Sequence, residues 1–319
     1  MNLLILNTIG EVFSDEAKNI INELGDVHYM SVSQEELMDK ICGYDAAIVG
    51  IGLNFDRPVL NKAERLKVLA TATTGLDHID MEFAQTKGIK VLSLRHEEEF
   101  LQSLTGTSEL VMGLLISIWR LLPHAHESVK NGEWDRERFR GKNIRGKTFG
   151  IVGMGRLGRM TAKYGAAMGM KILYTDPNVE GDFGNCYEKV SLHDLLKRSD
   201  AVSLHVHLSP ETENMINRST LAIIKPEAVI INTSRGRIVD EDALLDALLE
   251  KKIGGYAADV LRDELRFKGK TFGNNPLVEY SKENQNVIIV PHIGGMTHES
   301  RKLTDVFIAN KLKSFFGKS

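Results

Sequence analysis

Short apolar runs alternate with amphipathic segments over residues 1–100. The apolar runs, at residues 3–6, 27–30, 46–50, 68–72 and 89–92, have the length and composition of buried strands. Among the segments between them, residues 15–24 and 34–41 carry apolar positions at helical spacing. Strands that alternate with helices build a parallel sheet. Residues 1–100 are therefore predicted to form the first part of an α/β domain.

The same alternation returns in residues 101–292. A helix is predicted over residues 107–122, and because it is apolar on most faces we expect it to be buried. A charged, glycine-bearing loop over residues 130–147 follows it. Strands are then predicted at residues 148–152, 171–175, 201–206, 228–232, 255–260 and 287–290. Residues 101–292 are thus predicted to be a second parallel-sheet domain.

A glycine-rich turn joins the strand at residues 148–152 to a helix predicted over residues 156–168. The turn reads Gly153-Met154-Gly155-Arg156-Leu157-Gly158. At a strand-to-helix turn, the first glycine allows a tight bend and the second lets the backbone approach a pyrophosphate. The third glycine lets the helix pack closely, and the helix N-terminus attracts the phosphate charge. The sequence therefore predicts a Rossmann dinucleotide site.

The next predicted strand, residues 171–175, ends at Asp176, where the ribose of a dinucleotide would lie. A carboxylate there accepts hydrogen bonds from ribose hydroxyls and repels a 2′-phosphate. The residues that follow, Pro177 and Asn178, offer no arginine for such a phosphate. NAD is therefore the predicted cofactor, in preference to NADP.

The last amphipathic segment, residues 297–316, comes too late in the chain to belong to the alternation of the second sheet. We expect residues 293–319 to return as a helix to the domain begun by residues 1–100. The predicted fold class is therefore α/β, with two parallel-sheet domains. A Rossmann NAD-binding domain is inserted into a flavodoxin-like substrate domain.

Polar residues beyond the carboxyl ends of three predicted strands suggest a reaction. Arg235, Glu264 and His292 each follow such a strand, and ligands of open α/β sheets bind beyond those ends. An arginine binds a carboxylate through a planar fork, and a histidine exchanges protons near neutral pH. A glutamate beside the histidine would raise its pKa. This set suits the reversible reduction of a 2-keto acid by hydride from NADH.

Three further charged residues are alternatives for these roles. Arg237 lies two residues from Arg235, but we expect it to face solvent or to form a structural ion pair. Gly236 favours Arg235, because a glycine lets the backbone turn beside a ligand. Near Glu264, the acids Glu241 and Asp263 are interpreted as surface residues.

Composition narrows the class of protein. The chain has 319 residues, of which 42% are hydrophobic and 26% charged, with a net charge of −3. These values are typical of a globular protein and do not favour a nucleic-acid or membrane partner. The N-terminus has no basic segment before its short apolar run, so no signal peptide is expected. Cys42 and Cys186 match no redox spacing, so reduced thiols and a cytoplasmic location are expected.

No metal site is expected. The pairs His124/His126 and His205/His207 have no evident third ligand, and an i,i+2 pair shares a face only on a strand. The candidate partner is instead a small 2-keto or 2-hydroxy acid.

Five ordered motifs resemble the D-2-hydroxyacid dehydrogenase family, which includes D-3-phosphoglycerate dehydrogenases and glyoxylate or hydroxypyruvate reductases. The motifs are residues 74–80 (TGLDHID), 146–158 (GKTFGIVGMGRLG), 231–236 (INTSRG), Asp259 with Glu264, and residues 291–295 (PHIGG). The resemblance implies that Arg235, Glu264 and His292 are the catalytic trio. It also implies a cleft between the domains and a homodimer built largely around the cofactor domains.

The family's binding residues carry over position by position. The resemblance implies that the backbone of Thr74 and Gly75 binds the substrate carboxylate together with Arg235. It implies that Asp259 orients the nicotinamide. The full set of implied cofactor contacts is Gly153, Gly155, Arg156, Leu157, Gly158, Asp176, His205, Val206, His207, Thr212, Thr233, Ser234, Asp259 and Gly294.

The chain departs from the family pattern in five places, one of which is an apparent insertion over residues 266–274. His207 and Leu265 stand where the family usually has proline, and Met296 stands where a small residue is common. Residues 50–55 (GIGLNF) replace a loop that often carries an arginine-serine pair, which weakens the expectation of a phosphorylated substrate. Arg57 and Arg95, which are nearby, are interpreted as solvated surface residues.

Two alternatives remain on the same fold. One is an NAD(H)-sensing binding protein or corepressor-like scaffold, against which the retained Arg235, Glu264 and His292 argue. The other is formate dehydrogenase, for which glutamine would be expected in place of Glu264.

Overall fold

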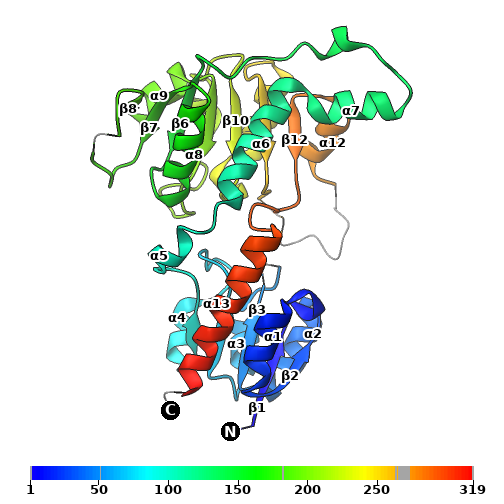
Figure 1. Ribbon diagram of the computed structural model, residues 1–319, viewed down its shortest axis with the longest axis vertical. Coiled ribbons are helices and arrows are strands. Elements are labelled where there is room, and N and C mark those ends of the chain that lie inside the picture. The colour runs from blue at the N-terminus through cyan, green and yellow to red at the C-terminus, as the bar shows by residue number, and fades with distance from the viewer. Residues whose placement is uncertain (1, 51, 182, 263, 265–273, 318–319) are drawn as a thin grey trace. The chain divides into compact units, whose positions relative to one another are not determined.

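The computed structural model describes residues 2–50, 52–181, 183–262, 264 and 274–317. They divide into two compact units. The first unit is Met1–Leu104 together with Thr297–Ser319, and the second is Thr105–Met296. The second unit is thus inserted in the chain between two parts of the first (Figure 1).

The first unit is built on a five-stranded parallel sheet with strand order β2-β1-β3-β4-β5. Its strands are β1 (Leu3–Asn7), β2 (Gly25–Tyr29), β3 (Ala46–Val49), β4 (Val68–Thr71) and β5 (Lys90–Leu92). Its helices are α1 (Asp15–Asn22), α2 (Gln34–Lys40), α3 (Arg57–Lys62), α4 (Met81–Thr86), α5 (Glu98–Leu101) and α13 (His298–Gly317), with 3-10 turns at Gly10–Val12 and Ile41–Gly43. This strand order is the flavodoxin-like one.

Helix α13 completes the core of the first unit. Ile308, Ala309 and Leu312 are buried in one apolar cluster with residues of α1 and of the central strands, and Figure 1 shows α13 beside α1. The carboxylate of Asp305 accepts a hydrogen bond of 3.0 Å from the N–H of Ser14, the residue before α1. The C-terminal segment is therefore part of the same folded unit as the N-terminal strands.

The second unit contains a seven-stranded parallel sheet of order β12-β11-β10-β9-β6-β7-β8. Its strands are β6 (Thr148–Val152), β7 (Lys171–Thr175), β8 (Tyr187–Lys189), β9 (Ala201–Leu204), β10 (Val229–Asn232), β11 (Gly255–Ala258) and β12 (Val287–Ile289). Its helices are α6 (Gly106–Arg120), α7 (Leu122–Lys130), α8 (Arg156–Ala167), α9 (Leu192–Arg198), α10 (Arg218–Leu221), α11 (Glu241–Leu249) and α12 (Pro276–Glu283), with 3-10 turns at Arg136–Phe139 and Gly236–Ile238. The prediction of two parallel-sheet α/β domains is confirmed.

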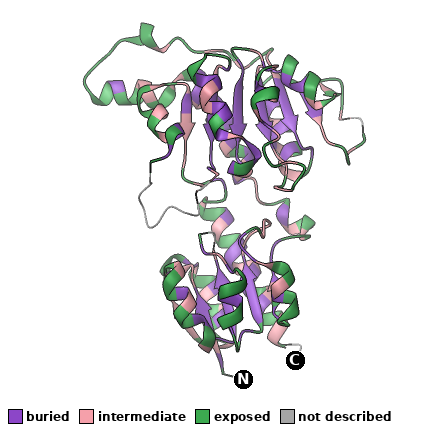
Figure 2. Ribbon diagram, turned by 180° about the vertical axis from the view of Figure 1, so that it is seen from behind, coloured by how far each residue is buried: buried purple, intermediate pink, exposed green. Residues whose placement is uncertain are grey.

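The central strands of both sheets are buried on both faces, whereas the outer faces of the helices are exposed (Figure 2). Buried parallel strands have no polar face, so they are nearly continuous apolar runs in the sequence. Strand β8 has no such run, because Tyr187–Lys189 lies at the sheet edge and is mostly exposed. The sequence did not predict β8, since an exposed edge strand of three residues leaves no apolar run.

The predicted helix over residues 107–122 ends at Arg120, where a left-handed residue follows. Leu121 has a left-handed conformation with φ 53°, and it separates α6 from α7. Pro123 lies in the first turn of α7, where its missing N–H costs no helical hydrogen bond. Helix α7 is therefore a separate helix, and it was not predicted from the sequence.

Among the described residues, one helical stretch, Glu98–Arg120, could cross a membrane by its length and composition alone, with a mean hydropathy of 1.2. The core helix of a globular unit passes the same test. In α6, Val111, Leu115 and Trp119 are buried in the apolar cluster of the second unit. Packing against the sheet accounts for the apolar character of this helix.

The Ile308→Ala substitution tests the place of α13 in the first unit. Because Ile308 is fully buried, the change should cost about 2–5 kcal/mol of unfolding free energy. Leu303→Ala on the exposed side of the same helix should change it by about 0.5 kcal/mol or less. Urea unfolding followed by circular dichroism measures both, and equal small effects would show that α13 does not pack in the core.

Candidate active site

The glycine turn after β6 leaves no room for a side chain at two of its three glycines. Gly153 has φ 93°, and a Cβ on it would lie 2.5 Å from the carbonyl oxygen of His205. A Cβ on Gly158 would lie 2.0 Å from the carbonyl oxygen of Gly153. Gly155, by contrast, has open space around it within 4 Å. The turn is therefore closely packed on one side and open at Gly155, as a pyrophosphate-binding turn requires.

Helix α8 begins at Arg156 directly after this turn. Its N-cap residue, Gly155, has no side chain to bind the first N–H groups, and the first turn carries no acidic residue. The N–H groups at Arg156 and Leu157 thus belong to a helix start that favours an anion. This arrangement fits the pyrophosphate of a dinucleotide.

Asp176 lies next to the same turn, one residue after β7. Its Oδ2 accepts a hydrogen bond of 2.7 Å from the N–H of Met154, and its Oδ1 accepts one of 2.8 Å from Asn178. A carboxylate has about four acceptor positions, so ribose hydroxyls can still donate to it. The structure therefore holds a negative charge beside the glycine turn, which fits NAD.

The segment after β9 supplies the other side of this turn. Burial lowers the pKa of His205 to about 4, so its imidazole is neutral, and its Nε2 lies 2.9 Å from the hydroxyl of Ser203. Thr212 donates from Oγ1 to the carbonyl oxygen of His207 at 2.6 Å. Val206 packs against the apolar core of the unit. This wall is uncharged near Gly153, as a surface for an adenosine requires.

The turn after β10 is shaped by Asn232, which is fully buried. Its Nδ2 donates to the carbonyl oxygen of Arg235 at 2.9 Å, and its Oδ1 accepts from the N–H of Ser234 at 3.0 Å. Ser234 in turn donates from Oγ to the carbonyl oxygen of Leu204 at 2.6 Å. Asn232 was not predicted from the sequence as a site residue. The signal in the sequence is an asparagine that ends an apolar strand, where a polar side chain needs hydrogen-bond partners.

Thr233 lies in the same turn and has a buried hydroxyl. Within the residues that the structure describes, Oγ1 of Thr233 has no hydrogen-bond partner. A buried polar atom without a partner is costly, and a bound ligand can satisfy it. Thr233 is thus suited to contact a cofactor, as the sequence predicts.

Arg235 follows, and its Nη1 donates to the carbonyl oxygen of Ser234 at 2.8 Å. Its competitor Arg237 forms an ion pair of 2.7 Å with Glu213, which confirms the interpretation as a structural residue. At Gly236 the structure shows a further requirement for glycine. A Cβ there would lie 2.0 Å from the backbone carbon of Leu261.

Glu264 and His292 are joined directly. Nδ1 of His292 lies 2.9 Å from Oε1 of Glu264, and the two side chains are 26% and 22% exposed. A carboxylate only accepts hydrogen bonds, so Nδ1 carries the hydrogen and Nε2 is left for chemistry. Desolvation lowers the pKa of His292, but the hydrogen bond and charge of Glu264, with the charge of Asp259, outweigh it and raise the pKa.

Asp259 positions the segment that carries His292. Its carboxylate accepts hydrogen bonds from the N–H groups of Ile293 at 2.6 Å and Gly294 at 2.8 Å. Its own carbonyl oxygen accepts from the N–H of His292 at 2.9 Å. Burial raises the pKa of Asp259. A Cβ on Gly294 would lie 2.9 Å from Oδ2 of Asp259, so this close contact requires glycine. His292 itself has a left-handed backbone, with φ 53°.

Thr74 and Gly75 belong to the first unit, just beyond β4. Thr73 orders this turn by donating from Oγ1 to the carbonyl oxygen of Gly75 at 2.8 Å. Within the described part of the chain, the N–H groups of Thr74 and Gly75 make no hydrogen bond. Both are therefore available donors.

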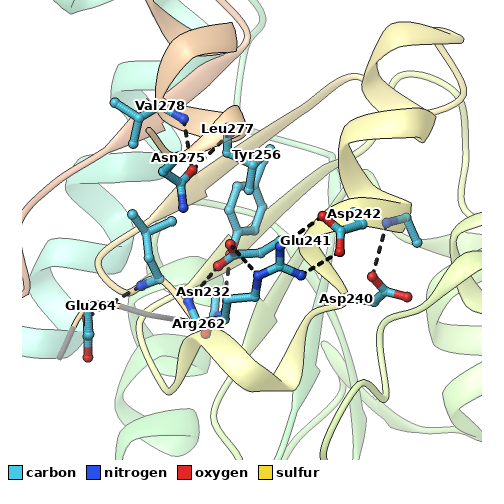
Figure 3. A network of polar contacts seen from close by, with 12 residues as sticks. Asn232, Asp240, Glu241, Asp242, Tyr256, Arg262, Glu264, Asn275, Leu277 and Val278 are labelled. Carbon is cyan, nitrogen blue, oxygen red and sulfur yellow. Dashed lines mark hydrogen bonds and ion pairs between the residues drawn. The ribbon is translucent and has the colours of Figure 1, made fainter. Parts of the chain in front are cut away.

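The remaining predictions concern residues near Glu264 and the search for a metal site. Leu265, and Asp263 beside Glu264, lie outside the described residues. Glu241 was interpreted as a surface acid, which is wrong, because it is 3% exposed and its Oε1 accepts from the N–H of Arg262 at 2.7 Å (Figure 3). Over the residues described, no group of three or more His, Cys, Asp and Glu side chains could hold a metal ion.

Comparison with known proteins gives the family. The family model described as the NAD binding domain of D-isomer specific 2-hydroxyacid dehydrogenase matches residues 112–294, and the model of the catalytic domain matches residues 3–98. The chain is 38% identical over 303 residues to D-3-phosphoglycerate dehydrogenase of Methanocaldococcus jannaschii, covering 94% of this chain and 55% of that protein. It thus spans about half the length of that relative.

Shorter relatives are covered more fully. The chain is 36% identical over 291 residues to glyoxylate reductase of Thermococcus litoralis, covering 88% of this chain and 82% of that protein. The crystal structure of D-lactate dehydrogenase from Aquifex aeolicus, complexed with NAD and lactic acid, matches with a TM-score of 0.84 at 27% identity, covering 99% of this chain and 96% of that one. The resemblance predicted from the motifs is confirmed: the chain belongs to the NAD-dependent D-isomer specific 2-hydroxyacid dehydrogenase family.

Proposed function

We propose that this protein interconverts 2-keto acids and D-2-hydroxy acids with NAD(H), and that His292 is its acid and base. The observation that carries the proposal is the hydrogen bond of 2.9 Å between His292 and Glu264. It leaves Nε2 of a histidine with a raised pKa for proton transfer, in a unit that matches the family's NAD-binding domain. A histidine whose pKa is raised by a paired carboxylate is typical of sites that transfer protons, which favours an enzyme over a binding protein.

The second unit has residues that fit NAD. We assign the pyrophosphate to the turn at Gly153, Gly155 and Gly158 with the start of α8, and the ribose to Asp176. The buried hydroxyl of Thr233 is assigned to the cofactor, because it has no partner among the residues described. When bound, the nicotinamide supplies or accepts the hydride.

Arg235 and His292 have separate tasks toward the substrate. The guanidinium of Arg235 binds the substrate carboxylate, because its planar fork matches two carboxylate oxygens and its charge does not titrate. In the reductive direction, the imidazolium of His292 gives its Nε2 proton to the carbonyl oxygen. In the oxidative direction, neutral Nε2 removes the hydroxyl proton. Glu264 holds the ring and stabilises its charged form in both directions.

For the substrate we propose an unphosphorylated 2-keto acid. Residues 50–55 contain no cationic side chain that could bind a phosphate. The next cation along the chain, Arg57, lies with its guanidinium carbon 4.9 Å from the ring centre of Phe83. Thr74 and Gly75 remain the predicted substrate-binding residues of the first unit, through the N–H groups described above.

We further propose that the protein is a cytoplasmic homodimer. Residues 101–292 would be the NAD-binding domain, and residues 1–100 with 293–319 the substrate domain. Support for a dimer comes from three exposed apolar side chains on α7 and the segment after it. Leu122 is 47%, Val129 49% and Trp134 88% exposed. Leu122 and Val129 are separated by two helical turns and so lie on one face of α7, and exposed apolar side chains that share a face favour coverage by a partner.

The His292→Asn variant tests the acid and base directly. It should lower kcat by about 10²–10⁴-fold because the proton donor is lost, while NADH affinity stays within about twofold. The measurements are NADH oxidation with a panel of unphosphorylated and phosphorylated 2-keto acids, and NADH fluorescence titration. Turnover close to that of the wild type would refute the role of His292. Tight NADH binding by a wild-type protein that reduces no member of the panel would favour an NAD(H)-sensing function instead.

Glu264→Gln tests the electrostatic coupling. Reduction needs protonated His292, so kcat/KM should be high at low pH and fall as the pH rises through the pKa of His292. Glutamine keeps an acceptor, but it weakens the hydrogen bond and removes the charge of Glu264, both of which raise this pKa, so the falling limb should move to lower pH. The pH profile of kcat/KM, measured over about pH 5–9, decides it. An unmoved limb would show that Glu264 does not control the titration.

Gly158→Ala tests whether NADH binding needs the close packing of α8 against the glycine turn. The added Cβ would meet the carbonyl oxygen of Gly153, so the variant should lose about 1–3 kcal/mol of stability and bind NADH at least about tenfold more weakly. Gly113→Ala in α6 is the matched control, since a Cβ there meets nothing within 4 Å. It should gain up to about 1 kcal/mol from helix propensity and leave NADH affinity unchanged. Equal NADH affinity in the two variants would contradict the assignment.

A further inference from the structure

The described part of the segment that carries Glu264 makes few hydrogen bonds within itself. Strand β11 ends at Ala258, and Glu264 lies beyond it in a 3-10 turn. Within this segment, the N–H of Glu264 donates to the carbonyl oxygen of Leu261 at 3.3 Å, and the N–H of Leu261 reaches Oε2 of Glu264 at 3.4 Å. Both distances are at the long end for hydrogen bonds. Shorter hydrogen bonds connect the described residues of this segment to another part of the unit.

Arg262, two residues before Glu264, provides strong bonds to the start of α11. Its Nη1 donates to Oδ2 of Asp242 at 2.6 Å, and its Nη2 donates to Oδ1 of the same carboxylate at 2.9 Å. Its backbone N–H donates to Oε1 of Glu241 at 2.7 Å. Figure 3 shows this fork, with Arg262 between Glu264 and the first turn of α11. A fork of two parallel bonds fixes orientation as well as distance.

The acceptor Glu241 adds to the rigidity of this contact. It is 3% exposed and lies near the fully buried Tyr256, whose pKa is raised by burial and also by the charge of Glu241. A buried carboxylate is stable only when it is paired or hydrogen-bonded. Arg262 provides both, since its Nε also lies 3.6 Å from Oε2 of Glu241. Breaking this contact would remove an ion pair and a hydrogen bond from a buried carboxylate.

The same segment touches the turn that carries Arg235. Gly236 packs against the backbone of Leu261 and Arg262, where a Cβ would lie within 2.4 Å of both residues. The side chain of Leu261 is itself buried. The backbone between Leu261 and Arg262 is therefore held from two sides, by Gly236 and by the first turn of α11.

We propose that Arg262 is a positioning residue, which holds Glu264 against His292 by locking its segment to Asp242 and Glu241 at the start of α11. Arg262 does not touch the reacting atoms in this assignment. It acts through Glu264, and the kinetic part of the inference rests on the function proposed above. The inference adds a determinant of the acid and base outside the trio itself.

The charged groups that face His292 define what the variants should change. They are Glu264 and Asp259, which raise its pKa, and Arg235, which lowers it. Asp259 is fixed by its bonds to the backbone of Ile293 and Gly294, so loss of Arg262 leaves it in place. Only the contact of Glu264 should loosen. The pKa of His292 should then fall, and the falling limb of the reductive pH profile should move to lower pH.

The test compares Arg262→Ala and Asp242→Asn with Arg218→Ala in the whole chain. Arg218, in α10, forms an ion pair with Asp246, which lies on α11 as Asp242 does. Since Arg218 is not in the segment of Glu264, Arg218→Ala is a matched control for the loss of an arginine–aspartate pair. The first readout is the NMR titration of the His292 imidazole, with the signal assigned by its loss in His292→Asn. The second is the pH profile of kcat/KM and the separate values of kcat and KM for the preferred keto acid.

Arg262→Ala should lower the pH at which His292 titrates and reduce kcat about tenfold, with KM changed by less than about twofold. Asp242→Asn should act in the same direction to a smaller extent, and Arg262→Lys should recover part of the loss because it restores the charge without the fork. Arg218→Ala should match the wild type. Because the side chain of Asp242 is 71% exposed, Asp242→Asn remains a decisive variant if Arg262→Ala does not fold.

His292 titrating in both Arg262→Ala and Asp242→Asn as it does in Arg218→Ala would overturn the proposal. So would an unmoved titration in Asp242→Asn if that is the only one of the two that folds. The NMR readout does not depend on turnover. A wild-type protein that reduced no keto acid would therefore count against the proposed function alone, while the titration would still decide the role of Arg262.

Discussion

The hydrogen bond between Glu264 and His292 is the interaction on which the candidate site depends. Two partly desolvated ionisable groups are stable together only when the geometry of their contact is fixed. At 2.9 Å, the bond sets which imidazole nitrogen carries a hydrogen and keeps the ring charged to higher pH. In the proposed reaction Arg235 binds the substrate carboxylate, and this pair moves the proton.

The fold meets that demand by fixing backbone rather than side chains. The three site residues follow β10, β11 and β12, which are neighbours in a parallel sheet, so their turns emerge at one edge. Two of these turns are each held by a buried polar residue that bonds main-chain groups. Asn232 shapes the turn of Arg235, and Asp259 shapes that of His292. For the turn of Glu264, the charged fork between Arg262 and Asp242 is the proposed equivalent.

Much of this could be predicted from the sequence, because it rests on local signals. Buried parallel strands are apolar runs, and Gly153 to Gly158 encode a turn by their lack of a side chain. Arg235, Glu264 and His292 stand directly after predicted strands. What could not be predicted depends on contacts distant in sequence. Glu241 is buried where it accepts a hydrogen bond from Arg262. Glycine is required at position 236 because a Cβ there would meet the backbone of Leu261. The edge strand β8 and the left-handed break at Leu121 leave no apolar pattern.

A double-mutant cycle between Glu264 and His292 tests the central claim most directly. The kcat/KM for NADH-dependent reduction is measured in the wild type, Glu264→Gln, His292→Asn and the double variant. If Glu264 acts only through His292, the double variant loses no more activity than His292→Asn alone, and the coupling is large. If the two single losses instead multiply, Glu264 acts independently of the imidazole, and the account of this pair as one proton-transfer unit is wrong.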